Sequence, residues 1–341
     1  DGDSDLSQVV AACETIRLIH GEIPVVFRST LPLGSTEHLA DWLGRDDLSS
    51  VATNPEFLRQ GSAVSDFLNP TRIVIGTHSG GTTAVSDALE RLYEGIEAPR
   101  IITDFASAEM IKNAANAFLG TKLSFVNEVA DLCEAYDANV DDVMAGIGLD
   151  PRIGSTYLRP GIGFGGSCLP KELANMVRLG RRHGLEMALL SGAARTNDER
   201  ATRVADRLED IAGPLHGARV AILGLAFKAD TDDVRYSPSL ALASTLIERG
   251  ASVRGHDPAV AAGATEHVVP DLARSATPEE AVMAADLVIL GTAWPLYREL
   301  DWASLGAGVA RRVIFDGSAA VDREAAERAG WRVITVGRSE G

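Results

Sequence analysis

A loop packed with glycine lies near the middle of the chain and leads to a thiol. Cys168 follows four glycines that fall within six positions, Gly161, Gly163, Gly165 and Gly166. Glycine tolerates positive φ and lets the backbone approach another group closely, so the stretch is predicted to be a tight loop rather than a helix or strand. Backbone N–H groups left free in such a loop can face a phosphate or an oxyanion.

The thiol of Cys168 is the best candidate in the chain for a covalent nucleophile. The attacking species is the thiolate, and the ammonium of Lys171 favours that form if it lies nearby. The alternative is a small buried cysteine in a tight turn, which is the usual place of a lone cysteine. The density of glycine and the Pro-Lys pair that follows favour a thiol that meets a substrate.

The chain of 341 residues is acidic, with a formal net charge of −16, and 45% of its residues are hydrophobic. This is enough chain for two domains with buried cores. The negative charge repels phosphates, which argues against nucleic acid as a partner. Cys13, Cys133 and Cys168 lack metal-type spacing, no run suits a membrane span, and the first residues do not resemble a signal peptide. We therefore expect a cytoplasmic protein with free thiols, no metal and no membrane partner.

Hydrophobic periodicity predicts an α/β chain with two doubly wound, Rossmann-like lobes joined by a long central helix. That helix covers residues 103–135, with Thr103 or Asp104 as its N-cap, and a shorter helix follows at residues 140–147. The first lobe is predicted to hold a helix at residues 6–20 and strands at residues 24–30, 51–53 and 72–76. The second is predicted to hold a strand at residues 219–224, a helix at 239–249, a strand ending at 256–258, and strands at 285–291, 313–316 and 331–336.

Lys112 and Asn116 lie four residues apart on the predicted central helix, so both project from one face toward the same ligand. An ammonium and an amide directed at one point stabilise negative charge that develops on an oxygen. Because Asn116 lies among alanines, its amide is expected to be buried and to have a purpose. The alternative is an exposed lysine beside an amide with no function.

Four sequence strings occur in the order that one known family shows. They are Asn54-Pro55-Glu56-Phe57-Leu58, Lys112-Asn113-Ala114-Ala115-Asn116-Ala117-Phe118, Gly163-Phe164-Gly165-Gly166-Ser167-Cys168-Leu169-Pro170-Lys171 and Gly224-Leu225-Ala226-Phe227-Lys228. Together they resemble the UDP-glucose/GDP-mannose dehydrogenase family, along nearly the whole chain. Ser167 favours the UDP-glucose 6-dehydrogenase branch, because related N-acetylmannosamine-type enzymes usually carry a histidine there. GDP-mannose stays open as the substrate.

The resemblance implies an NAD-dependent, two-step oxidation of a sugar C6 alcohol to the acid, with the carbon held as a thioester on Cys168. It implies that Lys112 and Asn116 hold the reacting oxygen, that Glu56 assists water, and that Thr30 supplies a hydroxyl near cofactor and water. The implied substrate contacts are Phe57, Leu58, Arg152, Tyr157, Gly161, Phe164, Gly165, Gly166 and Lys228, and the implied cofactor contacts are Ser29, Thr30, Gln60, Lys171 and Arg235. Arg152 matches an arginine that serves a neighbouring subunit, which implies a homodimer.

The chain departs from the family pattern at three places. Gln60 stands where members often have a second glutamate, and an amide cannot accept a proton at neutral pH. Glu172 stands where the family prefers aspartate, and Ser318 replaces an arginine that grips the substrate. Gln60, Ser318 and the absence of a G-x-G-x-x-G fingerprint favour, as an alternative, a catalytically silent nucleotide-sugar-binding module. A 2-hydroxy-acid or 3-hydroxy-acid dehydrogenase would share the fold and Lys112 but would give Cys168 no role.

The resemblance also implies a domain division. Family chains open with a strand and a G-x-G-x-x-G turn that binds the NAD pyrophosphate, and no such start precedes Asp1. We therefore expect the N-terminal part of the NAD-binding domain to be lacking, the first lobe to be incomplete, and NAD to bind weakly. The expected domains are the remainder of the NAD-binding domain at residues 1–102, a central helical dimerisation domain with the cysteine loop at 103–200, and a UDP-sugar-binding domain at 201–341.

Overall fold

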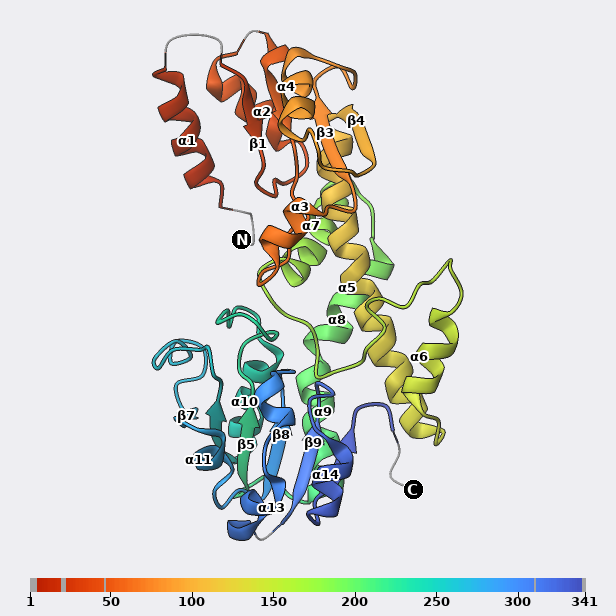
Figure 1. The fold of residues 1–341 in the computed structure, drawn as a ribbon, viewed down its shortest axis with the longest axis vertical. Coiled ribbons are helices and arrows are strands. Elements are labelled where there is room, and N and C mark those ends of the chain that lie inside the picture. Colours follow the sequence, from red (N-terminus) through yellow and green to blue (C-terminus); the bar gives the residue numbers. More distant parts are fainter. Residues whose placement is uncertain (1–4, 20–22, 46, 310, 339–341) are drawn as a thin grey trace. The chain divides into compact units, whose positions relative to one another are not determined.

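The computed structural model describes residues 5–19, 23–45, 47–309 and 311–338 (Figure 1). The chain separates into two compact units, Asp1–Ala117 and Phe118–Gly341. Each unit is built on a sheet of mostly parallel strands with helices packed on it, so the α/β fold class predicted from periodicity is confirmed.

The first unit contains a four-stranded sheet in the order β1-β2-β3-β4, in which only the β2–β3 pair is antiparallel. Its elements are α1 (Ser7–Arg17), β1 (Val25–Phe27), α2 (Ser35–Leu43), η1 (Leu48–Ser50), β2 (Val51–Thr53), α3 (Ala63–Leu68), β3 (Ile73–Thr77), α4 (Ala84–Leu92) and β4 (Arg100–Asp104). The predicted helix at residues 6–20 is confirmed as α1, and His20 lies outside the described residues. The strand β4 is not among the predicted ones.

Both faces of this sheet are covered by helices. Val51 of β2 packs with Cys13 of α1 and Leu39 of α2, whereas the next residue, Ala52, packs with Val85 of α4. Successive residues of a strand point to opposite faces, so β2 joins two apolar layers. A strand buried on both faces reads as a continuous apolar run, which is why residues 51–53 could be recognised.

The helix α5 extends over Phe105–Ala135, which is 31 residues, and it crosses the boundary between the two units. Of the two predicted N-caps, Asp104 fills that role. Its Oδ1 accepts a hydrogen bond from the N–H of Ser107 at 2.7 Å, and its Oδ2 accepts one from the Ser107 hydroxyl at 2.8 Å. The side chain thus satisfies an N–H group that has no partner within the helix.

The second unit contains a six-stranded, wholly parallel sheet in the order β10-β9-β8-β5-β6-β7. Its elements are α6 (Val140–Gly148), α7 (Leu169–Arg182), α8 (Ala188–Asp198), α9 (Arg200–Ala212), β5 (Arg219–Leu223), α10 (Pro238–Glu248), β6 (Ser252–His256), β7 (Ala273–Arg274), α11 (Pro278–Val282), β8 (Leu287–Leu290), α12 (Pro295–Arg298), α13 (Trp302–Leu305), η2 (Gly306–Gly308), β9 (Val313–Asp316), α14 (Arg323–Arg328) and β10 (Arg332–Thr335). The strand order reverses between β5 and β8. In such sheets ligands bind outside the carboxyl ends of the strands at this switch point.

The sheet of the second unit has two separate apolar layers. Ile289 of β8 packs in a cluster with Leu208 of α9 and Leu246 of α10, while the adjacent Leu290 packs in another cluster with Ala326 of α14. Helices therefore lie on both faces, which confirms the doubly wound arrangement predicted for this lobe.

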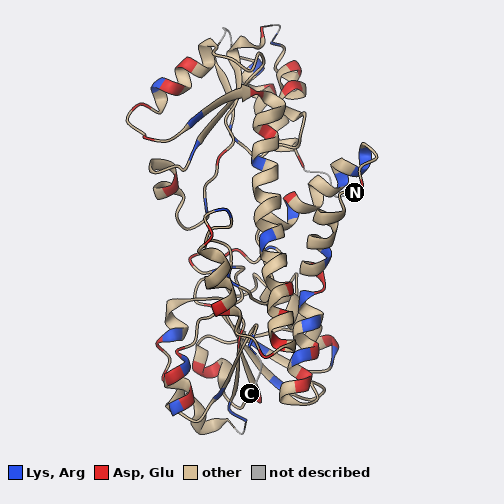
Figure 2. Cartoon of the chain, turned by 90° about the vertical axis from the view of Figure 1, so that its right-hand side faces the viewer, with Lys and Arg blue, Asp and Glu red and all other residues tan. Residues whose placement is uncertain are grey.

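Acidic and basic residues are interspersed on the helices of the second unit (Figure 2). None of the helices in the described part of the chain is long and apolar enough to cross a membrane. Among the same residues, no three His, Cys, Asp or Glu side chains gather into a group that could hold a metal ion.

Candidate active site

Lys112 is a buried cation in the first unit. The residue is only 4% exposed, and its ammonium donates a hydrogen bond to the backbone carbonyl oxygen of Glu56. The distance from Lys112 Nζ to Glu56 Oε1 is 3.6 Å, and the Glu56 side chain is 28% exposed. A buried ammonium therefore lies beside a carboxylate that solvent can reach. The Lys112 ammonium can donate a hydrogen bond to a hydroxyl group, and the adjacent Glu56 carboxylate can accept one from a water molecule.

Two cations lie near the aromatic ring of Phe57. The guanidinium carbon of Arg72 lies 3.7 Å from the ring centroid, and Lys112 Nζ lies 5.1 Å from it. Burial lowers the pKa of Arg72 from its usual value. Cations near an aromatic ring are attracted by its quadrupole, so Phe57 helps to keep both positive charges in place.

The turn before Glu56 is fixed by Asn54, which is 2% exposed. Its N–H donates to the carbonyl of Phe27 at 2.8 Å, and its Nδ2 donates to the carbonyl of Val74 at 2.7 Å. Its Oδ1 accepts a hydrogen bond from the hydroxyl of Tyr93. The Asn54 side chain thus joins β2 to β3, and the Asn-Pro string serves to position Glu56.

Asn116 is 9% exposed, as expected from its alanine-rich surroundings, and its Nδ2 is buried. No described residue accepts a hydrogen bond from that Nδ2. The neighbouring Asn113 differs, because its Nδ2 donates to the carbonyls of Leu31 and Glu109 and so holds local structure. A buried amide group that lacks an acceptor is costly, and a ligand oxygen would satisfy it.

Three of the residues implied for cofactor contact lie in the first unit. Ser29 and Thr30 follow the carboxyl end of β1, where Ser29 is exposed and Thr30 half-buried, and Gln60 is exposed. Within the described residues, neither of the two hydroxyls has a hydrogen-bond partner. Polar groups at the carboxyl end of a strand fit a dinucleotide, which carries ribose hydroxyls and an amide.

The N-terminus of α2, by contrast, is already occupied by Glu109. This carboxylate is 3% exposed and accepts hydrogen bonds from the N–H of Gly34 at 2.6 Å, the N–H of Thr36 at 2.7 Å and the hydroxyl of Thr36 at 2.6 Å. Burial raises its pKa, and the hydrogen bonds from Thr36 and Gly34 partly oppose that rise. The sequence analysis missed Glu109. Because Glu109 accepts from these donors, they are not free to bind a phosphate.

Cys168 is exposed and stands at the N-cap position of α7 in the second unit. Pro170 lies in the first turn, where its missing N–H costs nothing. The Ser167 hydroxyl lies 3.7 Å from the Cys168 sulfur. The N-cap position places the thiol beside the first N–H groups of the helix. The predicted tight loop therefore delivers a reachable thiol.

The glycines before Cys168 allow close contact with the segment that precedes α10. A Cβ on Gly165 would lie 2.0 Å from the carbonyl oxygen of Tyr236. Gly166 has a φ of +82°, a Cβ there would lie 2.7 Å from the ring of Phe227, and its N–H donates to the carbonyl of Arg235 at 2.9 Å. These residues are glycine because a side chain would push the two segments apart.

Asn197, which the sequence analysis missed, fixes the peptide of Phe164 from both sides. Its Oδ1 accepts from the Phe164 N–H at 2.9 Å, and its Nδ2 donates to the Phe164 carbonyl at 3.1 Å. Gly161 is held in the same way, since its N–H donates to Asn127 Oδ1 and its carbonyl accepts from Arg200 Nε. The loop before the thiol is therefore rigid at two peptides.

Arg235 lies within electrostatic reach of the thiol. Its guanidinium forms a 2.6 Å ion pair with Asp233. The hydrogen bond to Asp233 raises the pKa of Arg235, and the charge of Cys168 contributes in the same direction. Lys228 is half-buried, with its Nζ 5.7 Å from the Phe227 ring centroid, and Lys171 is exposed. The structure thus brings Arg235 together with Cys168.

Arg152 is largely exposed and Tyr157 is partly exposed in the second unit. The Arg152 side chain is 87% exposed and forms a 2.6 Å ion pair with Asp150, and Tyr157 is 38% exposed with a φ of 58°. Among the described residues, Asp150 is the one that forms an ion pair with Arg152. The assignment of Arg152 to a neighbouring subunit stays a prediction.

The carboxyl ends of β5, β8 and β9 are followed by Gly224, Gly291 and Gly317. A Cβ on Gly224 would lie 2.5 Å from Thr292, and one on Gly317 would lie 2.5 Å from Ile162. The Ser318 hydroxyl oxygen is buried and lacks a hydrogen-bond partner among the described residues. Close backbone contacts thus line the place where parallel sheets bind ligands.

Asp257, at the carboxyl end of β6, is a second buried acid that the sequence analysis missed. Its Oδ2 accepts hydrogen bonds from the N–H groups of Leu225 and Ala226 at 2.8 and 3.0 Å and from Trp294 Nε1 at 3.2 Å. The carboxylate therefore holds the start of the loop that contains Phe227 and Lys228.

Profiles of the UDP-glucose/GDP-mannose dehydrogenase family match three parts of the chain. The NAD binding domain matches residues 1–97, the central domain residues 106–199 and the UDP binding domain residues 221–323. The prediction that this chain lacks the N-terminal part of the NAD-binding domain is therefore not supported, because the match to that domain starts at residue 1. The expectation rested on a missing glycine turn, which is a short signal compared with a match along residues 1–97.

Two relatives with assigned names are similar over nearly the whole chain. A UDP-glucose 6-dehydrogenase of Rickettsia conorii is 36% identical over 341 residues, covering 98% of this chain and 78% of the relative. A UDP-glucose 6-dehydrogenase of Bacillus subtilis is 37% identical over 348 residues, covering 99% and 77%.

Two solved structures are similar as well. A UDP-glucose dehydrogenase from Pyrobaculum islandicum has a TM-score of 0.85 at 36% identity, covering 97% of this chain and 77% of that one. A UDP-D-ManNAc dehydrogenase from Pyrococcus horikoshii has a TM-score of 0.83 at 27% identity, covering 99% and 78%.

Proposed function

Because the chain belongs to the UDP-glucose/GDP-mannose dehydrogenase family and contains its NAD-binding domain, we propose that it oxidises the C6 alcohol of UDP-glucose to the carboxylate of UDP-glucuronate. The observation that carries this proposal is Cys168, an exposed thiol at the N-terminus of α7 behind a loop fixed by Asn197. Such a thiol suits covalent capture of an aldehyde. The named relatives support UDP-glucose as the sugar nucleotide.

The residues divide the reaction into charge stabilisation and covalent capture. Lys112 and Asn116 stabilise negative charge on the C6 oxygen, since both are buried and the Asn116 amide has a donor to offer. NAD, when bound, accepts the hydride in each of two oxidations. The Cys168 sulfur bonds to C6 of the aldehyde as a thiohemiacetal, which the second oxidation turns into a thioester. Water assisted by Glu56 then adds to C6, the C–S bond breaks, and the acid leaves with the thiolate restored.

We assign Ser29, Thr30, Gln60, Lys171 and Arg235 to NAD, and the unbonded hydroxyls of Ser29 and Thr30 support this assignment. The substrate would contact Phe57, Leu58, Arg152, Tyr157, Gly161, Phe164, Gly165, Gly166 and Lys228. We also propose the division into residues 1–102, 103–200 and 201–341, to which the three matched domains lend support. The free state of Cys13, Cys133 and Cys168 agrees with a cytoplasmic location.

We further propose that the protein is a homodimer. Three large apolar residues of α5 recur every seven positions and are exposed, Phe118 at 67%, Phe125 at 51% and Leu132 at 59%. Residues seven apart lie on one face of a helix, and an apolar stripe of this kind is typical of helix pairing between subunits.

The decisive experiment follows NADH formation with UDP-glucose or GDP-mannose. Two NADH per UDP-glucose, with UDP-glucuronate as the product, supports the proposal, and preference for GDP-mannose assigns the other substrate. Cys168→Ser should still bind UDP-glucose, seen as a rise in melting temperature, but should lose turnover because a serine hydroxyl is rarely ionised at neutral pH. Full activity of that variant overturns the thioester mechanism.

A silent sugar-nucleotide-binding module is the second candidate, and Gln60 and Ser318 are the observations that favour it. It predicts a melting-temperature rise with UDP-glucose but no NADH formation at any NAD concentration. The same two measurements therefore separate the candidates.

A further inference from the structure

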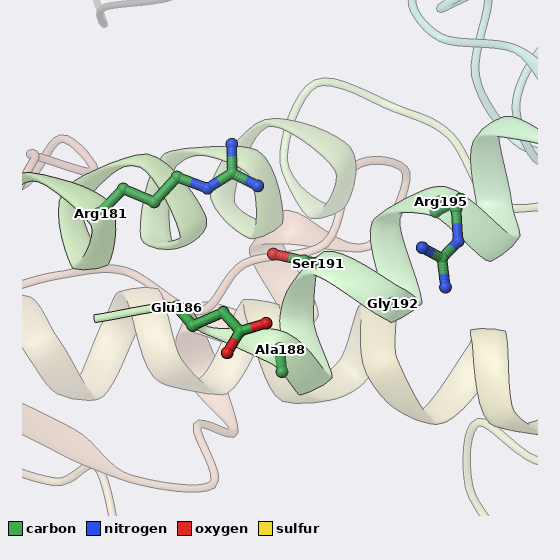
Figure 3. Close-up of a pocket in the computed structure, with 6 residues that line it drawn as sticks. All are labelled: Arg181, Glu186, Ala188, Ser191, Gly192 and Arg195. Atoms are coloured by element: carbon green, nitrogen blue, oxygen red, sulfur yellow. The ribbon is translucent and has the colours of Figure 1, made fainter. Parts of the chain in front are cut away.

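An open hollow of about 470 Å³ lies between the end of α7 and the start of α8 (Figure 3). It is separate from every residue assigned above to substrate or cofactor. Its lining residues are Arg181, Glu186, Ala188, Ser191, Gly192 and Arg195. The volume falls within the range of about 300–1,000 Å³ that is common for small-molecule sites.

The two arginines of this hollow lack carboxylate partners. Throughout the described ranges, no side chain makes a hydrogen bond or ion pair with the guanidinium of Arg181 or Arg195. Two unpaired guanidinium groups around one hollow indicate an anionic ligand, because planar guanidinium groups bind phosphate and carboxylate oxygens well.

Two further groups make the hollow suitable for a ligand with hydroxyls. Figure 3 shows the Ser191 hydroxyl between the side chains of Arg181 and Glu186, and its oxygen has no hydrogen-bond partner within the described chain. The Glu186 carboxylate can accept hydrogen bonds from hydroxyl groups, but it repels a bare anion. The start of α8 has no side-chain cap, so its N–H groups add to the positive potential.

We propose that this hollow binds a phosphorylated sugar, with the phosphate on Arg181 and Arg195 and a sugar hydroxyl on Glu186. The site is distinct from the thiol site, because Cys168 precedes the first turn of α7 whereas Arg181 lies in its last turn. At 1.5 Å per residue these two positions are roughly 20 Å apart along the helix.

Isothermal titration of the whole protein with glucose 1-phosphate and with inorganic phosphate tests the proposal. Glucose 1-phosphate should bind, and more tightly than inorganic phosphate. The double variant Arg181→Ala and Arg195→Ala should lose about tenfold or more in affinity for both, since charge-assisted hydrogen bonds are removed. Glu186→Gln should reduce the preference for glucose 1-phosphate, because it replaces a charged acceptor for the hydroxyl by a weaker neutral one and removes the repulsion of the bare anion.

Arg298→Ala is the matched control, since Arg298 is exposed on α12 and lies outside the hollow, and it should bind both probes as the wild type does. Saturating UDP-glucose should not displace glucose 1-phosphate. Displacement by UDP-glucose, unchanged affinity in the double arginine variant, or no binding at millimolar concentration would each overturn the site. Equal affinity for the two probes would overturn the sugar as part of the ligand.

Discussion

The ammonium of Lys112 donates to the backbone carbonyl of Glu56 and lies 3.6 Å from the carboxylate of the same residue. One cation is therefore held by two oxygens of a residue that is 56 positions away in sequence. The arrangement leaves the Glu56 carboxylate partly exposed while the Lys112 side chain is 6% exposed. A substrate oxygen would have to share this ammonium, which makes Lys112 the most informative residue of the first unit to change.

Lys112→Ala should reduce kcat by about 10²- to 10³-fold, the usual effect of removing one group that stabilises an oxyanion. KM should change less if the ammonium acts mainly on charge that develops during the reaction. Steady-state NADH formation with UDP-glucose measures both. Lys122→Ala on the same helix is the control, because the hydrogen bonds of Lys122 within the described ranges go to the carbonyls of Ile153 and Gly154. Equal losses in both variants would mean that the effect comes from damage to α5.

Gly165→Ala should destabilise the second unit by about 1–3 kcal/mol, the usual cost of overpacking. The new Cβ would lie 2.0 Å from the Tyr236 carbonyl oxygen, so the cysteine loop must move away from the segment before α10. Urea unfolding measures the loss. Gly146→Ala, in α6, is the control, because its Cβ would meet nothing within 4 Å and alanine favours a helix. A Gly165→Ala variant as stable as wild type would contradict the contact.

His256 should make the second unit less stable as the pH falls below about 6.5, the ordinary pKa of histidine. The ring is buried, and burial lowers its pKa, although the charge of Asp257 opposes this and the charge of Arg274 adds to it. The Tyr297 hydroxyl gives its proton to the His256 carbonyl, so Nδ1 donates to that hydroxyl over 3.0 Å. Protonation of the His256 ring would add a second buried N–H, at Nε2, together with a buried positive charge.

Proton binding by the folded and unfolded chains decides whether stability rises or falls with pH. Because the folded pKa of His256 is lowered, the unfolded chain binds more protons between that pKa and about 6.5, so stability is present above this window and lost as the pH falls through it. Urea unfolding of wild type and His256→Gln at a series of pH values isolates the contribution. The stability of the variant should depend less on pH between pH 7 and pH 5 than that of the wild type, and parallel curves would rule out His256.

The strands and the long helix could be predicted because their signals are local. The apolar run at residues 219–224 became β5, and the helix predicted for 103–135 became α5 with Asp104 as its cap. The strand β4 was missed because its first two residues, Arg100 and Ile101, are exposed, so it lacks the alternation of a half-buried strand. The helix α7 has Leu173 and Val177 buried four apart after Pro170, a pattern that could have been recognised.

The partners within the candidate site could not be predicted in the same way. Asn197 reaches the Phe164 peptide across 33 residues, and Glu109 reaches Gly34 across 75. No periodicity or propensity connects such residues, because their contact depends on how helices and strands pack. Local patterns pointed to Lys112, Asn116 and Cys168, and the resemblance gave them roles, whereas the residues that hold them in place came only from the structure.

The apolar stripe on α5 should hold two copies of the chain together. Phe125 is at its centre, with Phe118 and Leu132 seven residues away on either side, and all three are more than half exposed. Phe125→Glu places a charge in the proposed interface, which costs far more there than in water. Sedimentation at micromolar concentration should show a dimer for wild type and a monomer for the variant. Val64→Glu, at an exposed apolar residue of α3, is the control and should remain a dimer. A monomeric wild type would overturn the stripe as an interface.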